Sequence, residues 1–237
     1  MYAPLLPGDR SVFAWEWLRR DPLYKKAAEG SAGREWSPEA ERWGLVTFEA
    51  PGISALWARP LWSAAAHLPV LPVVARGSRP GGDCFDLERF AALSRLVAGD
   101  GREHLLISDG LRTIRIDVLA GTLSRGPTRL HYLLSGLASA EKPQLTLQRL
   151  IALARAGRFS RTLHPREPRA RRWVLMLRAY DALRAGADQR EIAQWLLSRE
   201  AGEPRWRSLA PSVRSQVQRL VRGARLMACG GYRTLLG

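Results

Sequence analysis

Residues 171–198 read RRWVLMLRAYDALRAGADQREIAQWLLS, and residues 212–227 read SVRSQVQRLVRGARLM. In both stretches apolar residues recur at intervals of three and four, which is the period of an amphipathic helix. The pattern predicts three helices, over 171–185, 188–198 and 212–227, with the spacing of a helix-turn-helix. We therefore expect an all-α helix-turn-helix domain in the last third of the chain.

The ends of the first two helices carry recognisable capping residues. Gly186 follows the first helix, where glycine commonly takes the left-handed conformation that ends a helix. Asp188 precedes the second helix and Glu191 follows three residues later, an aspartate version of the capping box. These residues predict a tight turn between the two helices.

The charge of the chain is concentrated in the same region. From residue 155 to residue 237 there are 18 Arg, no Lys and six acids, so this segment carries +12 of the formal net charge of +15. The preceding residues hold 19 bases and 16 acids. An arginine-rich coding bias would not produce this asymmetry, whereas a polyanionic partner such as double-stranded DNA explains it.

The apolar residues of the 212–227 helix leave a polar face turned outward. Arginine suits guanine edges, glutamine suits adenine, and short serines let a helix approach the floor of the major groove. We expect five side chains to read bases, namely Ser212, Ser215, Gln216, Arg219 and Arg222. The flanking side chains expected to contact phosphate are Arg207, Arg214, Gln218 and Arg225, and Arg190 in the preceding helix completes the candidate set.

The rest of the chain predicts an α+β protein. Apolar and polar residues alternate over 69–75, 104–108, 113–119 and 129–134, which predicts a small antiparallel sheet with a hairpin turn at Asp109-Gly110. We divide the chain into an α+β region, residues 1–136, and a helix-turn-helix-like domain, residues 137–237. In the strand over 113–119, the face of Arg115 and Asp117 is expected to be wet.

Helices are predicted over 12–23, 87–97 and 145–156. Six of the nine Trp precede residue 63, which indicates a compact aromatic core more often than a base-stacking surface. The arginine-rich segment 157–169 is either an arm that grips phosphates or a solvated linker.

Other classes of protein find little support. No apolar run approaches the roughly 18 residues that span a bilayer, and the first residues lack a secretory pattern, so we expect a cytoplasmic protein that does not enter membranes. Cys84 and Cys229 have no ligand spacing for zinc. Asp83, Asp86 and Glu88 form one acidic cluster, but acids at a helix start are explained by capping. We expect no catalytic residue, metal or cofactor.

Two resemblances extend these inferences. The run 188–193, DQREIA, with Ser212-Val213-Arg214 downstream resembles the promoter-reading region of sigma factors, although 199–211 replaces their short turn. Residues 171–186, 189–193, 219–227 and 230–236 resemble the DNA-binding domain of a proteobacterial family of transcription factors. FAWEWLRRDPLY at 13–24 and Trp43-Gly44-Leu45 resemble the transcriptional regulator-like domain that often precedes it.

The family resemblance implies a role and partners. Members with both parts resemble activators of excision and transfer genes on integrative and conjugative elements, with RNA polymerase as a partner and a small antiactivator protein that holds them off. The same DNA-binding domain resembles that of regulators of type VI secretion genes.

Three alternatives stay open beside the activator. The first is an excision or recombination accessory factor that bends DNA. The second is a Mg²⁺-dependent nucleic-acid-processing enzyme that uses Asp83 and Asp86. The third is an interaction protein whose basic face binds an acidic protein.

Overall fold

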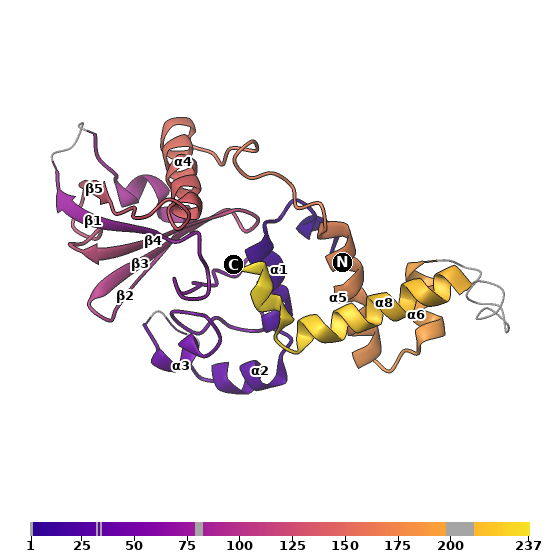
Figure 1. The fold of residues 1–237 in the computed structure, drawn as a ribbon. Helices are drawn as coiled ribbons and strands as arrows, with labels where there is room; N and C mark the ends of the chain where they lie inside the picture. The colour runs from indigo at the N-terminus through magenta and orange to yellow at the C-terminus, as the bar shows by residue number, and fades with distance from the viewer. Residues whose placement is uncertain (1, 32, 34, 79–82, 198–210) are drawn as a thin grey trace.

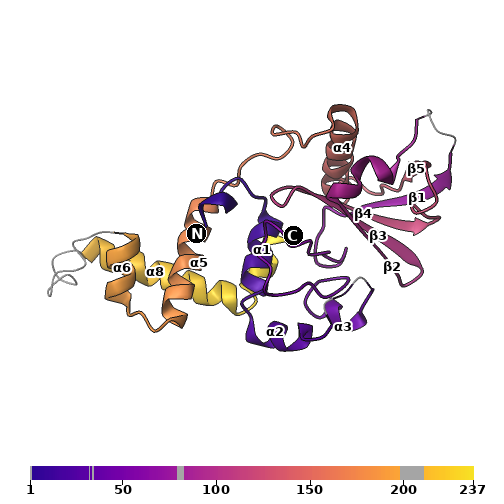
Figure 2. The same ribbon diagram turned by 180° about the vertical axis from the view of Figure 1, so that it is seen from behind.

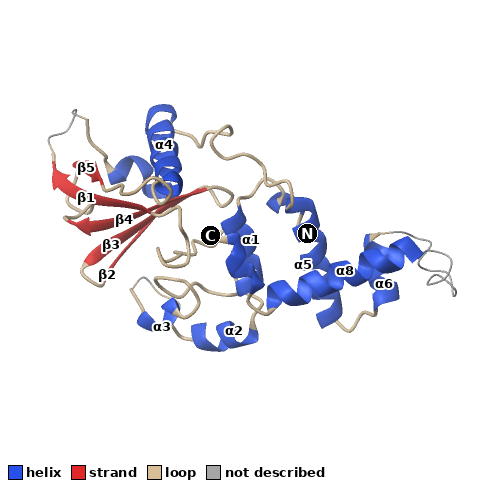
Figure 3. Ribbon diagram, in the orientation of Figure 1, coloured by secondary structure: helices blue, strands red, loops and turns tan. Residues whose placement is uncertain are grey.

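The computed structural model describes residues 2–31, 33, 35–78, 83–197 and 211–237 of the chain. A five-stranded sheet occupies the middle of the sequence, and helices lie at both ends (Figures 1 and 3). The N-terminal elements are η1 (Ala3–Leu5), α1 (Arg10–Leu18), α2 (Pro22–Ala28) and α3 (Pro38–Glu41). The sheet region comprises β1 (Leu71–Gly77), η2 (Leu87–Leu93), β2 (Ser94–Gly99), β3 (Arg102–Ser108), β4 (Thr113–Ala120) and β5 (Thr128–Tyr132). The C-terminal elements are α4 (Glu141–Ala156), α5 (Ala170–Arg184), α6 (Gln189–Leu196), α8 (Pro211–Ala228) and η4 (Gly231–Leu235).

The sheet has the strand order β2-β3-β4-β1-β5. Neighbouring strands are antiparallel except for β1 and β4, which are parallel with Leu71 opposite Ile116. The prediction of an antiparallel sheet is therefore wrong for this central pair. The reason is a crossover. Strand β1 lies between β4 and β5 in the sheet, so the connection from β4 to β5 has to pass the end of β1. Gly121, with φ +83°, makes this passage, and a Cβ there would lie 1.9 Å from the Ala75 carbonyl oxygen.

The helix predicted over 87–97 is wrong in its second half. Residues 87–93 form the 3-10 helix η2, whereas residues 94–99 form the edge strand β2 paired with β3. Asp100 and Gly101 join the two strands with φ of +52° and +69°. Positive φ at both central residues is the geometry of a type I′ hairpin turn, for which Asp-Gly is a strong signal. Long-range pairing with β3 therefore overrides the local helical pattern.

The helix predicted over 12–23 is two helices. Asp9 caps α1 by accepting hydrogen bonds from the backbone nitrogens of Ser11 and Val12. Asp21 caps α2 in the same way, and Pro22 stands at its first position. Proline disfavours helical backbone in the residue before it, so the chain breaks between the two helices.

Two large apolar cores hold the molecule together. The first core joins the N-terminal segment to α5, α6, α8 and η4, and it includes Phe13, Trp17, Trp173, Leu177 and Tyr232. The second core joins the sheet to α4 through Leu150 and Leu153. Figures 1 and 2 show α1 between the sheet and the C-terminal helices from both sides. The division of the chain at residue 136 stays a prediction.

The N-terminal segment also covers one face of the sheet. Arg115 and Asp117 on β4 are 2% and 3% exposed, so the wet face expected there is wrong. The Arg115 guanidinium lies 2.7 Å from the Asp117 carboxylate and donates through Nε to the Trp62 carbonyl oxygen, at 3.0 Å. His104 on β3 completes the cluster, with Nδ1 2.7 Å from Asp117. Paired charges can be buried here because each one has a partner.

The tryptophans of the N-terminal segment mostly pack inside. Trp15, Trp17 and Trp62 are buried, and Trp15 meets Tyr24 edge to face with ring centroids 5.8 Å apart. Trp57 is 78% exposed. The predicted aromatic core is therefore confirmed, and Trp57 is not part of it. Among the described residues, no helix is long and apolar enough to cross a membrane.

Candidate nucleic-acid interface

The α8 helix divides its side chains between two faces. Its inner face packs on α5 and α6 through Val217, Leu220, Val221, Ala224 and Met227. The contact with α5 is close, since a Cβ at Gly223 would lie 2.9 Å from the Met176 methyl carbon. This packing holds α8 against α5 and α6, and Figure 1 shows the helix extending away from the sheet.

The outer face of α8 carries the candidate residues. The exposed polar side chains are Ser212, Arg214, Ser215, Gln216, Gln218, Arg219, Arg222 and Arg225. Four of them, Ser215, Gln218, Arg219 and Arg222, line one shallow hollow on the helix surface. At about 1.5 Å per residue this group spans about 10 Å of helix, which is comparable to the width of the major groove of B-DNA.

Two candidates lie elsewhere. Arg190 lies on α6 and is half-buried. Arg207 lies outside the described residues, as does most of the predicted 199–211 connection. The structure therefore brings eight of the ten candidates together on α8.

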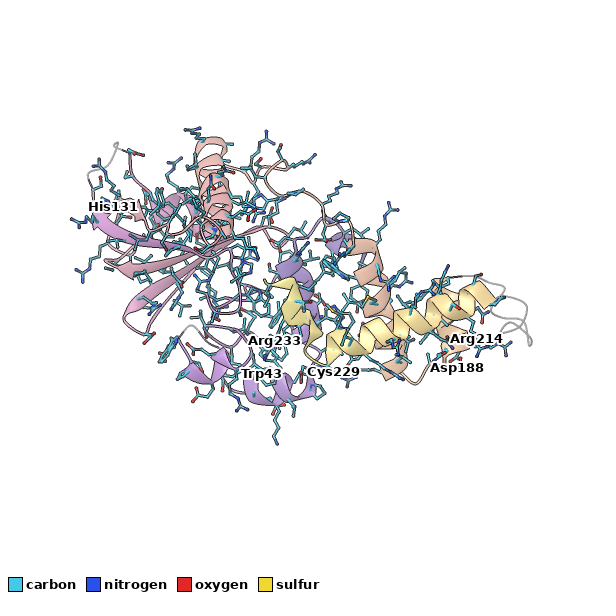
Figure 4. The ribbon with its side chains drawn as sticks, in the orientation of Figure 1. Trp43, His131, Asp188, Arg214, Cys229 and Arg233 are labelled. Atoms are coloured by element: carbon cyan, nitrogen blue, oxygen red, sulfur yellow. The ribbon has the colours of Figure 1, made fainter. Side chains whose placement is uncertain are left out.

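The start of α6 has the capping box that the sequence predicts. The Glu191 backbone nitrogen donates to Asp188 Oδ1 at 2.9 Å, and the Asp188 backbone nitrogen donates to Glu191 Oε2 at 2.8 Å. Gly186 has φ +92°, as expected for the residue that ends α5. Figure 4 shows Asp188 and Arg214 at the same end of the molecule, away from the sheet. This end is therefore ordered by local hydrogen bonds as well as by the apolar core.

A second row of arginines lies outside α8 and was not among the predicted site residues. Arg171, Arg172 and Arg178 are exposed on α5. Arg171 and Arg178 are seven residues apart, two helical turns, so they lie on one side of the helix. The arginine spacing in the sequence was the signal for this row.

The 157–169 segment is anchored and also presents arginines. Phe159 is buried in the second core, and the buried His164 meets its ring edge to face, with centroids 5.5 Å apart. Burial, with the nearby charge of Arg149, holds the pKa of His164 below its usual value. Arg158 and Arg161 remain exposed. The segment is thus a tethered basic strap and not a free linker.

An ion pair ties α5 to the N-terminal segment. Arg20 donates through Nε to Asp181 Oδ1 at 2.8 Å, and Tyr2 donates to the other Asp181 oxygen. Burial alone would raise the pKa of Asp181, but the hydrogen bonds from Arg20 and Tyr2 and the charge of Arg20 hold that pKa below its ordinary value. The Asp181 carboxylate is therefore paired with Arg20 and Tyr2, and it does not compete with a polyanion for the exposed arginines of the basic helices.

The described residues do not favour the nuclease alternative. No group of three His, Cys, Asp or Glu side chains in the described part of the chain could hold a metal ion. Asp86 caps η2 by accepting from the Glu88 backbone nitrogen at 3.1 Å. Cys84 and Cys229 are free thiols.

Comparison with known protein families agrees with the basic helical surface. Residues 136–237 match a family model described as the DNA-binding domain of a T6SS transcription factor. Residues 1–47 match a proteobacterial transcriptional regulator-like domain. Together these matches support a DNA-binding transcription factor. They point to a regulator and not to an enzyme, and comparisons with curated proteins and with solved structures gave no match.

The matched regions correspond to particular parts of the fold. The DNA-binding match includes α4, α5, α6, α8 and η4, and so every candidate residue. The regulator-like match includes α1, α2 and α3. The sheet, β1 to β5, falls between the two matches. The first core therefore packs one matched region against the other.

Proposed function

We propose that this chain is a sequence-specific transcriptional activator of the helix-turn-helix type, in which α8 enters the major groove of double-stranded DNA. The observation that carries the proposal is the outer face of α8. It gathers arginine, glutamine and serine side chains on a helix whose inner face is fully packed. A rigid helix with donors and acceptors along one side is how many proteins read base edges.

The surrounding arginines suit contacts with the DNA backbone. Two of these arginines, Arg214 and Arg225, flank the reading face together with Gln218. The exposed arginines of α5 and of the basic strap lie outside that face. Phosphate contacts position a protein without reading sequence, and each one releases counterions. We infer that these groups supply the non-specific part of the affinity.

The target genes and protein partners are proposed from family resemblance. The chain would activate excision or conjugative-transfer genes of a mobile element, in the cytoplasm, with RNA polymerase as its partner. A small antiactivator protein would bind and restrain it. Genes for type VI secretion are the other candidate target, because the DNA-binding match is described by that system.

The deciding experiment is selection from a randomised duplex library at near-physiological salt, with sequencing of the bound DNA and a parallel salt titration. We expect an enriched motif for the full chain. A variant with Arg219→Ala and Arg222→Ala should lose the motif but retain salt-dependent binding. A control with Arg76→Ala, an exposed residue of the sheet, should select the same motif as the unchanged chain.

Two results would contradict this proposal. Steep salt dependence without any motif would leave a non-specific or DNA-bending protein. No binding to any duplex would remove the DNA-binding role altogether.

A further inference from the structure

A cleft of about 380 Å³ lies between α4 and the start of α1. Its walls come from the start of α1, from α4, from the 165–168 segment and from residues 235–237 after α8. His67, Pro69, Thr113 and Arg115 complete the lining. This volume is in the range of small-molecule sites, about 300 to 1,000 Å³. None of the candidate residues on α8 lines it.

The cleft contains more cationic than anionic side chains. Two of its five cations are already paired: Arg10 lies 2.7 Å from Glu167, and Arg115 lies 2.7 Å from Asp117. Lys142, Arg149 and Arg166 have no ion pair within the described residues. Lys142 and Arg166 are therefore available to an anionic ligand. Arg149 donates through Nε to the Leu163 carbonyl oxygen at 2.9 Å, and its two terminal nitrogens are the part that a ligand would meet.

Asp9 is the remaining acidic side chain of the lining, and its oxygens are engaged. Oδ1 accepts from the backbone nitrogens of Ser11 and Val12, at 3.0 and 3.3 Å. Oδ2 accepts from the Thr113 hydroxyl at 2.9 Å. Asp9 is thus mainly a helix cap, and it offsets one of the three available positive charges at most.

Burial and the nearby charges of Arg115 and Arg149 lower the pKa of His67 to about 4, against the opposing charge of Asp9. His67 is therefore neutral near pH 7. Its Nδ1 lies 3.2 Å from the Leu236 carbonyl oxygen, to which a protonated Nδ1 donates. In this neutral tautomer the Nε2 atom carries the lone pair, so His67 adds no positive charge to the cleft.

The other walls are apolar. Pro69, Leu145, Pro165, Pro168 and Leu235 contribute hydrocarbon surface to the cleft. Lys142 and Arg149 are half-buried among these walls, unlike the exposed arginines of α8. A DNA backbone needs cations on an open surface, whereas a cleft with apolar walls and a few polar groups suits a small molecule.

We propose that this cleft is a binding site for a small organic anion, a molecule with a carboxylate or phosphate group next to an apolar moiety. Lys142 and Arg149 hold the anionic group, and the proline and leucine walls hold the apolar part. The ligand contacts α4 on one side and, on the other, Leu235 and Leu236 of the first core, which follow α8. The site goes beyond the proposed function, because ligand binding here needs no DNA.

The test is ligand-observed NMR titration of the full chain with benzoate, phenyl phosphate and neutral benzamide. We expect benzoate or phenyl phosphate to bind at least about tenfold more tightly than benzamide, since a charge-assisted hydrogen bond contributes about that factor. Which of the two anions binds better identifies the anionic group. Failure of the DNA selection would leave this result unaffected.

Matched lysine variants locate the binding. Lys142→Met should weaken binding of the anions by about tenfold, whereas Lys26→Met, on the exposed surface of α2, should leave it unchanged. Leu145→Trp keeps every charge and narrows the cleft, so it should abolish binding while circular dichroism shows a folded chain. Equal binding of all three probes, no binding at all, or an equal effect of the two lysine variants would overturn the proposal. If Lys142→Met weakens binding of DNA and no small anion binds, the cations of the cleft contact DNA phosphates, and the proposal is also overturned.

Discussion

Two arginines on α8, six residues apart, should differ in what they do. Arg219 lines the hollow on the outer face, and Arg225 lies on its flank. Arg219→Ala should relax sequence preference and cost about 1 to 3 kcal/mol on the preferred duplex, because a bidentate contact to guanine is lost. Arg225→Ala should weaken binding to all sequences alike and lower the salt slope by about one unit. Fluorescence anisotropy on the selected duplex and on a scrambled one measures both, and equal effects of Arg219→Ala on the two duplexes would refute its reading role.

The Asp181 carboxylate should make the stability of the fold depend on pH. Its folded-state pKa lies below the unfolded value, because Arg20 and Tyr2 hydrogen-bond to the charged form against the opposing effect of burial. A group with a lowered pKa stabilises the fold above its unfolded pKa, and that contribution is lost as the pH falls through the folded pKa. Asp181→Asn should therefore lower the free energy of unfolding by about 1 kcal/mol at pH 7, a modest figure because the carboxylate is partly exposed.

The free energies of unfolding of Asp181→Asn and of the unchanged chain, measured with urea, should approach each other as the pH falls below the unfolded aspartate pKa of about 3.9 and through the lower folded-state pKa, where the folded carboxylate takes up a proton. Asp188→Asn is a matched control, since that carboxylate caps a helix and forms no ion pair with any described residue. A gap between Asp181→Asn and the unchanged chain that is the same at pH 7 and pH 3 would show that the charge of Asp181 is not what stabilises the fold.

At the scale of single elements, the capping box should hold the start of α6. Asp188→Ala removes the acceptor for the Glu191 backbone nitrogen and should cost about 1 kcal/mol of stability. Asp188→Ser keeps a capping oxygen and should cost much less. The measurement is the midpoint of urea unfolding at constant slope. An equal loss for Ala and Ser would mean that the capping oxygen is not what stabilises the start of α6.

The crossover between β4 and β5 should depend on a single glycine. Gly121 and Gly126 both have positive φ, +83° and +97°, but only at Gly121 would a Cβ collide with the backbone of β1. Gly126→Ala adds backbone strain alone, about 1 kcal/mol. Gly121→Ala adds the clash with the Ala75 carbonyl, and it should destabilise by at least about 2 kcal/mol more. Similar unfolding free energies for the two variants would contradict the close passage.

Local signals predicted the local elements well. The helical period predicted the exposed and buried faces of α8, and Gly186 and Asp188 marked the turn before α6, all of which the structure has. The Asp100-Gly101 turn is also a signal between neighbouring residues, and it indicates the β2-β3 hairpin that the predicted helix over 87–97 missed. The capping and the exposure of the candidate site were therefore readable from neighbours in the sequence.

Long-range partners were not readable in this way. The parallel pairing of β1 with β4 depends on a crossover, and the burial of Arg115 depends on Trp62 and Asp117. A single arginine in an alternating strand looks the same whether it faces water or a covering segment. Only the placement of the N-terminal segment decides between these outcomes, and no local pattern encodes it.

At the scale of the whole molecule, both cores cross the segment around residue 136. The first core joins α1 to α5 and α8, and the second joins the sheet to α4. A cut after Gly136 falls in an exposed stretch, yet it leaves each half with parts of two cores and the whole of neither. The exposed apolar faces of the halves would then be complementary.

We therefore expect fragments 1–136 and 137–237 to be poorly folded alone and to associate when they are produced together. Size-exclusion chromatography should show a one-to-one complex with the elution volume of the intact chain. Circular dichroism of fragment 137–237 alone should show a broad thermal transition, because α5 and α8 lack the side chains of α1 against which they pack. If that fragment alone unfolds as cooperatively and at the same temperature as the intact chain, the shared core contributes little, and the DNA-binding helices are an independent domain.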